Sequence, residues 1–464
     1  MAKRGRFGES QRTVCPLDFR YGRKEMLEIF SEESRLEHLL KVEAALARAH
    51  AKLGNIPAKD ATVISQKANI NHISLEKVKL IEQETKHDLM AVVRALTSEA
   101  GSAGKYVHLG ATSYDIVDTA VAIQIQNAIV LLKSDLIILL KVLVSLMKKH
   151  TATIMLGRTH GQYAVPITFG LKLSVFGMEF YRHLQRLSEA ECRICVGKFS
   201  GAVGTGAALG KDALKLQELV MTDLGLGFEL AATQIVNRDR HIEFVSALVN
   251  IATSAEKLAT EIRNLQRSEI LEVAEAFDTE KQVGSSTMAH KRNPITSENI
   301  CGLARVVRGF IIPTYENAIQ WHERDLANSS SERFIIPHTC VLVDDILNKL
   351  SKLLKNLEVY SATMKRNLEK AGGEIMAEAI MQALTTKGMA RDEAYGIVRG
   401  VTVDARKSGN DFKTELMKKN QIKKLLTQYE LETALNPKNY LGSSKSIVSK
   451  VAEIITKSKL MKGN

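Results

Sequence analysis

The sequence predicts an all-α fold of three helical domains, in which the central domain is a long helical bundle. Of the 464 residues, 45% are hydrophobic and only 5% are aromatic, a balance that favours aliphatic helix packing. Prolines occur only at positions 16, 57, 166, 294, 313, 337 and 437. The stretches on both sides of Pro166 are therefore long enough for uninterrupted helices. Strand and helix patterns do not alternate along the chain. The predicted domains are 1–111, 112–358 and 359–464.

The first predicted boundary lies near residues 101–110, where glycines interrupt the helical periodicity. The segment 118–149 that follows contains no glycine or proline and is apolar on nearly every face. A helix that is apolar all round must be enclosed by other helices. We therefore expect this segment to lie at the centre of the bundle, with helices of sister subunits among its neighbours.

The segment 239–275 is predicted to be a second long helix of the bundle. Apolar residues recur there at alternating spacings of four and three, as expected for a face that packs on another helix. They are Phe244, Leu248, Ile251, Ala255, Leu258, Ile262 and Leu265. Between the two segments, the glycines of 201–210 lack the spacing of a phosphate-binding loop and predict a tight passage between helices. The C-terminal domain follows a break near 360–373.

Composition argues against a membrane, secreted or zinc-binding protein. The first residues are polar, and the most apolar run, 128–147, carries Lys133, Asp135 and Lys141. Five cysteines are an odd number, and the pair Cys192 and Cys195 lacks the further ligands that a zinc site needs. We expect a soluble, cytoplasmic protein without a bound metal.

The net charge of +12 raises the alternative of a nucleic-acid-binding protein. The lysines, however, are spread along helices without interleaved aromatic residues, which is typical of a solvated basic face. Binding to duplex or single strands with a strong salt dependence would support the alternative. We expect no nucleic-acid partner and no membrane partner.

Four polar segments interrupt the helical pattern, and each carries residues that suit an anionic ligand. They are 86–88 together with 108–115, 158–162, 284–294 and 321–333. Taken singly, each has a simpler explanation, because a lone histidine is usually structural and Thr-Ser or Ser-Ser pairs often cap helices. Arginine forks with hydroxyls between them, as at Arg324 and Arg333, nevertheless match the oxygens of a phosphate.

Residues 284–294, Gly-Ser-Ser-Thr-Met-Ala-His-Lys-Arg-Asn-Pro, resemble the signature loop of the fumarase/aspartase superfamily, Gly-Ser-Ser-x-Met-Pro-x-Lys-x-Asn. Ala289 replaces the family's proline, and we expect a more mobile open loop because proline restricts the unfolded chain. Further motifs are similar to the branch that acts on succinylated purine nucleotides, and they occur in that branch's order over essentially the whole chain. They are Pro-Leu-x-x-Arg-Tyr at 16–21, Lys-His-Asp at 86–88, and Arg324 with Ser329 and Arg333.

The resemblance implies a β-elimination that cleaves a C–N bond and releases fumarate. The implied substrates are adenylosuccinate, which gives AMP, and the succinyl-aminoimidazole-carboxamide ribonucleotide of de novo purine biosynthesis. No metal or organic cofactor is implied, and in this family the active sites lie where the subunits of a homotetramer adjoin. Two alternatives stay open: another fumarate-releasing lyase, such as argininosuccinate lyase, and a non-catalytic structural protein on the same scaffold.

The resemblance also implies roles for individual residues. Ser285 is the general base, and His160 is the general acid that protonates the leaving nitrogen, with His87 as a second histidine. Lys291 stabilises the negative charge that develops on a carboxylate and on the serine oxygen, and Glu298 positions either Lys291 or a water-linked proton. The predicted substrate-binding residues are Arg20, Tyr21, Asp88, Thr112, Ser113, Thr159, Gln234, Ser286, Asn293, Arg324, Ser329 and Arg333.

Overall fold

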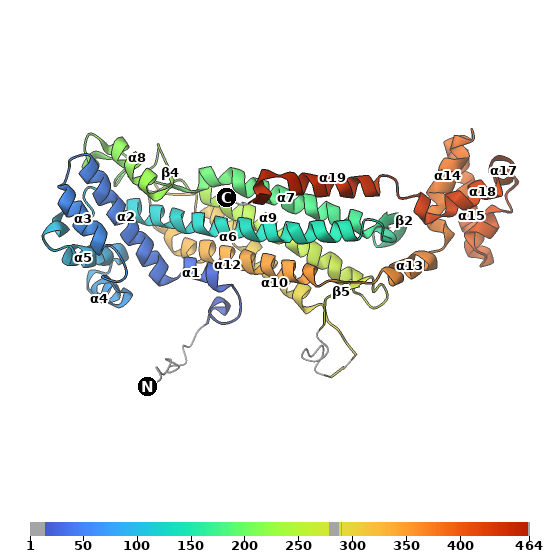
Figure 1. Cartoon of the computed structure of the whole chain (residues 1–464), viewed down its shortest axis with the longest axis horizontal. Helices are drawn as coiled ribbons and strands as arrows, with labels where there is room; N and C mark the ends of the chain where they lie inside the picture. The colour runs from blue at the N-terminus through green and yellow to red at the C-terminus, as the bar shows by residue number, and fades with distance from the viewer. Residues whose placement is uncertain (1–13, 278–286, 289, 463–464) are drawn as a thin grey trace. The chain divides into compact units, whose positions relative to one another are not determined.

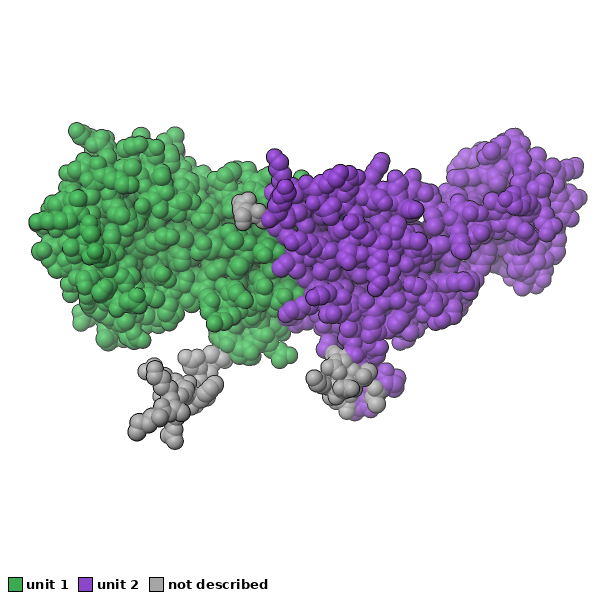
Figure 2. Space-filling model, viewed as in Figure 1, with its two compact units in different colours: residues 1–136, 183–255, 302–348 green, residues 137–182, 256–301, 349–464 purple. Residues whose placement is uncertain are grey.

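The computed structural model describes residues 14–277, 287–288 and 290–462, and these residues contain nineteen α-helices (Figure 1). The predicted all-α class is therefore confirmed. The described chain divides into two compact units, which Figure 2 colours separately. Unit 1 comprises residues up to 136, 183–255 and 302–348, and unit 2 comprises 137–182, 256–301 and 349–464. No helix in the described ranges is long and apolar enough to cross a membrane.

Five long helices each contribute residues to both units. They are α6 (Ser113–Lys149), α7 (Phe169–Ile194), α9 (Asp239–Leu265), α10 (Ile295–Gly309) and α12 (Ala327–Lys355). The predicted helix at 118–149 is α6. The predicted helix at 239–275 is α9, which ends earlier, at Leu265, and its apolar stripe is buried. Within unit 2, α7, α9 and α12 line the same small apolar cavity, so these helices pack side by side there.

Unit 1 contains the N-terminal helices and the connections between the long helices. Its shorter elements are η1 (Pro16–Asp18), α1 (Lys24–Ile29), α2 (Glu32–Lys52), α3 (Ala58–Lys67), α4 (Leu75–Thr85), α5 (Asp88–Glu99), η2 (Gly101–Tyr106), η3 (Ala207–Leu209), α8 (Ala213–Leu224), α11 (Ile311–Glu316) and the parallel pair β3 (Val196–Gly197) and β4 (Gly227–Phe228). Helices α2, α3, α5 and α8 share one aliphatic core with the start of α6. Serine N-caps at Ser31 and Ser74 fix where α2 and α4 begin.

Unit 2 contains two antiparallel strand pairs and the C-terminal helices. The pairs are β1 (Ile154–Thr159) with β2 (Gln162–Thr168) and β5 (Val273–Ala274) with β6 (Glu358–Val359). The helices are α13 (Ser361–Lys370), η4 (Gly373–Met376), α14 (Ala377–Thr386), α15 (Arg391–Ser408), α16 (Phe412–Leu416), α17 (Asn420–Leu425), α18 (Gln428–Leu435), η5 (Pro437–Asn439), α19 (Ser444–Lys457) and η6 (Lys459–Lys462). Helices α14 to α18 enclose a core of their own, and the chain then returns so that Ser458, after α19, accepts a hydrogen bond from Tyr181 of α7.

The predicted division into three domains, 1–111, 112–358 and 359–464, stays a prediction. The two compact units cut across it because the long helices pass from one unit to the other. A sequence pattern can predict where helices begin and end. The division into compact units depends instead on which neighbours pack against each part of a long helix.

Candidate active site

The predicted site residues fall into two groups, one in each unit. Unit 1 holds ten of them: Arg20, Tyr21, His87, Asp88, Thr112, Ser113, Gln234, Arg324, Ser329 and Arg333. Unit 2 holds Thr159, His160, Lys291, Asn293 and Glu298. Ser285, Ser286 and Ala289 lie outside the described residues.

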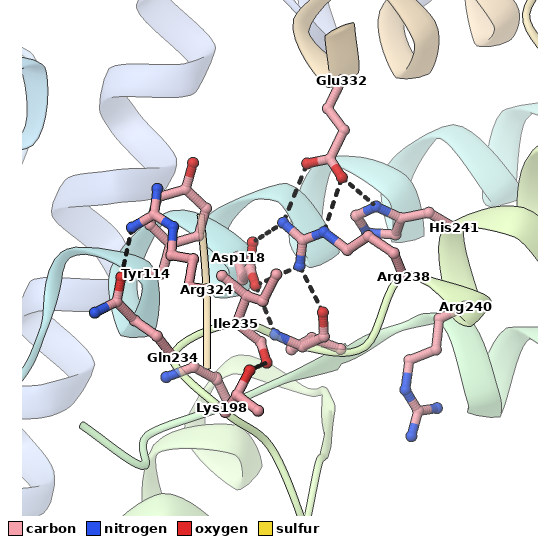
Figure 3. A network of polar contacts seen from close by, with 12 residues as sticks. Tyr114, Asp118, Lys198, Gln234, Ile235, Arg238, Arg240, His241, Arg324 and Glu332 are labelled. Atoms are coloured by element: carbon pink, nitrogen blue, oxygen red, sulfur yellow. Dashed lines mark hydrogen bonds and ion pairs between the residues drawn. The ribbon is translucent and has the colours of Figure 1, made fainter. Parts of the chain in front are cut away.

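In unit 1, Arg324 belongs to a cluster of polar side chains and lies against Tyr114 and Gln234 (Figure 3). Its guanidinium carbon lies 3.6 Å from the ring centroid of Tyr114, and its NH1 group donates to Gln234 Oε1 at 2.6 Å. The hydroxyl of Tyr114 donates to Ser329 Oγ at 3.0 Å. Gln234 is thus brought together with Arg324 and Ser329, which both belong to the predicted polar segment 321–333, and Tyr114 joins them.

Backbone contacts fix the two segments that supply Gln234 and Arg324. The amide nitrogen of the Gln234 side chain donates to Ala202 O at 3.0 Å, and its backbone N–H donates to Glu323 O at 3.2 Å. Asp325 accepts from the backbone N–H groups of Ala327 and Trp321, at 2.8 and 2.9 Å, which lowers the pKa of its carboxyl. Asp325 therefore acts as the cap that leads the 321–325 turn into α12.

A buried arginine that the sequence analysis missed lies beside this cluster (Figure 3). Arg238 forms a bidentate pair with Asp118 of α6, with N–O distances of 2.8 and 2.9 Å, and a second pair with Glu332 of α12 at 2.8 and 3.1 Å. Burial alone would lower the pKa of Arg238, but the two carboxylates raise it. Arg238 thus joins α6 to α12 close to Tyr114 and Ser329, which lie on the same two helices.

The ion pair with Arg238 also changes the pKa of Glu332. Burial alone would raise the pKa of Glu332, whereas Arg238 and His241 lower it to about 2. Nothing in the sequence links Arg238 with Asp118 and Glu332, which lie far from it along the chain. Only the tertiary structure reveals this contact.

The predicted residues Asp88 and Arg333 form an ion pair in unit 1. Asp88 Oδ2 accepts from the NH2 groups of Arg333 and Arg35, both at 3.0 Å. Burial raises the pKa of Asp88, but the two arginines and the N–H of Leu89 outweigh burial and lower it. His87 is exposed at the N-terminus of α5, where its Nδ1 accepts from the backbone N–H of Met90 at 3.3 Å.

Thr112 and Ser113 stand at the start of α6, which a buried carboxylate holds in place. Asp115 accepts from the backbone N–H groups of Thr112 at 2.8 Å and Ser200 at 3.0 Å, and it pairs with the buried ammonium of Lys198. The glycine segment 201–210 adjoins Ser200 and is tightly packed, as predicted. A Cβ added at Gly204 would lie 2.1 Å from the carbonyl oxygen of Ala232, so there is no room for a side chain there. Arg20 is exposed and Tyr21 is half-buried after η1.

In unit 2, His160 lies exposed at the tip of a β-hairpin. The sequence pattern predicts only a polar break between helices here, and this prediction is wrong in that two strands flank the turn. Thr159 pairs with Gln162, so the loop has two residues, and both have left-handed backbones, with φ of 52° at His160 and 73° at Gly161. Two left-handed residues define a type I′ turn, whose twist suits a two-residue hairpin.

A bidentate ion pair anchors the hairpin. Arg158 donates to the two oxygens of Glu272 at 2.8 and 3.0 Å, and Asn367 donates to the same carboxylate at 2.9 Å. Glu272 is fully buried, and Leu156 packs in a small core with α13 and α14 residues. The end of β1 that leads into the turn at His160 is therefore anchored by buried contacts.

The signature segment is followed directly by α10, and the carboxylate of Glu275 binds the first turn of this helix. Glu275 accepts from the backbone N–H groups of Thr296 and Ser297 at 3.0 and 2.7 Å, which caps α10 from outside the helix. Lys291 and Glu298 both have exposed side chains, and the described part of the chain contains no hydrogen bond between them. The predicted contact of Glu298 with Lys291 stays a prediction, as does the role of Asn293.

No group of three or more histidine, cysteine, aspartate or glutamate side chains in the described ranges is placed to hold a metal ion. Cys192 and Cys195 are both free thiols, the first exposed and the second buried. Burial raises the pKa of the Cys195 thiol to about 12.

Long helices that carry a cluster of arginine, amide and hydroxyl groups in one unit and an exposed histidine in the other are compatible with the helical lyases. The model of a family described as lyase matches residues 19–309, and a model described as adenylosuccinate lyase C-terminus matches residues 373–451. The first match alone covers more than half of the chain. The chain therefore belongs to this lyase family.

Relatives and solved structures narrow the assignment. The chain is 50% identical to the adenylosuccinate lyase of Pyrococcus abyssi and 48% identical to that of Methanothermobacter thermautotrophicus, each over 95% of this chain and 98% of the relative. The crystal structure of a fumarate lyase from Mesorhizobium sp. BNC1 matches with a TM-score of 0.86 and 33% identity, over 93% of this chain and 98% of that one. Within the family, the chain belongs with the adenylosuccinate lyases.

Proposed function

We propose that this protein cleaves adenylosuccinate into AMP and fumarate, and that it cleaves the succinyl-aminoimidazole-carboxamide ribonucleotide by the same elimination. One observation of the structure carries the proposal. Gln234 and the segment that carries Arg324 and Ser329 are far apart along the chain, and they meet in one cluster that offers guanidinium, amide and hydroxyl groups. Such a set suits the phosphate of a nucleotide, which argininosuccinate lacks.

The elimination begins with the removal of a proton from the carbon next to a carboxylate, and Ser285 is the proposed base. The electron pair left on that carbon places additional negative charge on the carboxylate, which Lys291 and Asn293 stabilise. Lys291 has an exposed ammonium, so it is accessible to an anionic substrate. Ser286 and Thr159 are proposed to bind the same succinyl moiety.

The second step breaks the C–N bond, and the leaving nitrogen takes a proton from His160. An imidazole suits this role because its ordinary pKa lies close to neutral pH. The exposure of His160 at the tip of a rigid turn supports the assignment. Once the nitrogen is protonated, fumarate and the amino-nucleotide separate.

The remaining predicted residues are proposed to bind the nucleotide. Arg324, Ser329 and Arg333 hold its phosphate, while Gln234 positions Arg324 through their hydrogen bond. Arg20, Tyr21, Thr112 and Ser113 complete the nucleotide site, and His87 with Asp88 lies beside Arg333.

The proposed active form is a cytoplasmic homotetramer whose sites are shared between subunits. Helix α6 supports this proposal. The helix is strongly apolar, yet the side chains of Val130 and Ile138 on it are exposed in the isolated chain. Large apolar side chains exposed on a central helix are typical of a surface that another subunit covers.

The purified protein, incubated with adenylosuccinate and without added metal, tests the proposal. We expect AMP and fumarate to form in equal amounts, measured by chromatography. The same protein should release no fumarate from argininosuccinate. Release of fumarate from argininosuccinate alone would assign the chain to a different lyase activity.

A further inference from the structure

Tyr114 touches two of the proposed phosphate-binding residues with two different parts of its side chain. Its ring lies against the guanidinium of Arg324, 3.6 Å from centroid to carbon, and its hydroxyl donates to Ser329 at 3.0 Å. A cation over a tyrosine face is attracted by the electron density of the ring, which helps to hold the guanidinium in position. Tyr114 therefore holds Arg324 and Ser329 in a fixed relation to each other.

Both partners keep donors that these contacts do not use. Arg324 uses NH1 for Gln234 and Nε for the backbone oxygen of Asp325, and its NH2 group has no hydrogen-bond partner among the described residues. Ser329 accepts the proton of the Tyr114 hydroxyl, so its own O–H proton is free to be donated. The NH2 group of Arg324 and the hydroxyl of Ser329 therefore remain available to bind an anion.

The position of Tyr114 is itself fixed by the ion pairs of Arg238, which join the helices α6 and α12. It lies one turn before Asp118 on α6, and Ser329 lies one turn before Arg333 on α12 and close to Glu332. Because Arg238 binds Asp118 and Glu332 together, the two helices that carry Tyr114 and Ser329 cannot easily slide past each other. The hydrogen bond between Tyr114 and Ser329 therefore spans a gap that the ion pairs hold constant.

We propose that Tyr114 is a positioning residue, which aims the free N–H groups of Arg324 and the free hydroxyl of Ser329 at one anionic group of the substrate, the phosphate. This inference rests on the proposed function, because it names the part of the nucleotide that the cluster reads. Tyr114 acts through its two neighbours and makes no direct contact with the phosphate in this arrangement. It should govern nucleotide affinity rather than the chemical step.

Two substitutions separate the two contacts. Tyr114→Phe keeps the ring under Arg324 and removes the hydroxyl, so the KM for adenylosuccinate should rise about fivefold, the usual effect of one hydrogen bond. Tyr114→Leu also removes the ring, and loss of the cation–π contact should bring the total rise to about 25-fold. In both variants kcat should stay within about twofold of the wild type, because the base and the acid lie elsewhere.

Product inhibition identifies the anion that Tyr114 serves. The inhibition constant of AMP, which carries the phosphate, should rise in parallel with KM, whereas that of fumarate should not change. Ser329→Ala with Tyr114→Phe should be no worse than Ser329→Ala alone, since both changes remove the same hydrogen bond. Tyr395→Phe, an exposed tyrosine on α15, is the matched control and should leave every constant unchanged.

The outcomes distinguish this inference from the proposed function. An active wild type whose KM is unchanged in Tyr114→Leu would overturn the role of Tyr114, as would a fumarate inhibition constant that rises as much as that of AMP. A wild type that does not cleave adenylosuccinate would instead contradict the proposed function. Far-ultraviolet circular dichroism checks folding, and Tyr114→Phe preserves the packing of the ring if Tyr114→Leu fails to fold.

Discussion

The carboxylate of Glu332, which pairs with the buried Arg238, is a charge whose contribution to stability can be tested through pH. Its folded pKa is lowered to about 2 from an ordinary value of 4.5. A carboxyl whose pKa is depressed in the folded state contributes stability above its unfolded pKa. That contribution is lost as the pH falls through the folded value.

Glu332→Gln should therefore lower the free energy of unfolding by about 3 kcal/mol at neutral pH, because it leaves Arg238 with only one of its two carboxylates. The difference from the wild type should shrink as the pH falls from about 4.5 towards about 2. Urea unfolding over this pH range measures it. Glu369→Gln, at an exposed position on α13, is the control and should change stability by less than about 0.5 kcal/mol.

The proposed base and acid are the second residue-scale test. Ser285→Ala and His160→Ala should each lower kcat by at least about a hundredfold while substrate binding persists, because both groups act chiefly in the transition state. Steady-state kinetics and equilibrium binding of adenylosuccinate measure the two effects. His72→Ala, an exposed histidine after α3, should behave like the wild type. Near-normal turnover in either variant would contradict its assigned role.

At the scale of the element, the sequence pattern predicted two of the five long helices, α6 and α9, and missed the hairpin. Helices of many turns repeat their apolar stripe often enough to be recognised, as on α9, where the stripe from Phe244 to Leu265 is buried throughout. The strands β1 and β2 have six and seven residues, and Pro166 within the second argues against a strand. The available signal was Gly161 in a two-residue turn between short apolar runs.

The turn makes a prediction about Gly161. Its φ is 73° and a Cβ there would meet no atom within 4 Å, so only backbone conformation opposes a side chain. Gly161→Ala should destabilise the hairpin by about 1 kcal/mol and lower kcat several-fold, because His160 would lose its fixed direction. Gly161→Asn should have a smaller effect, because asparagine tolerates a left-handed backbone. Thermal melts and steady-state kinetics of both variants measure this, and equal effects of alanine and asparagine would argue against a conformational cause.

At the scale of the whole molecule, some residues proposed for the site from the sequence lie together in the structure, whereas the contacts that fix them could not be predicted. Gln234, Arg324 and Ser329 were predicted from resemblance, and they do lie together in unit 1. Tyr114 and Arg238 were not predicted, because their roles depend on partners from distant parts of the chain and no local spacing marks such pairs. The described residues likewise divide into two interleaved units, which follows from packing rather than from the order of segments.

Assembly is the largest-scale prediction, and it rests on the exposed apolar residues of α6. The wild type should elute as a particle of four chains of 51.3 kDa each in size-exclusion chromatography with light scattering. A Val130→Lys and Ile138→Lys double variant should yield smaller, less active particles, because charges would be buried against a sister subunit. Val403→Lys on α15, which is also an exposed valine, should remain a tetramer. A double variant that keeps both the mass and the activity of the wild type would show that α6 is not covered by another subunit, and a monomeric, fully active wild type would remove the need for shared sites.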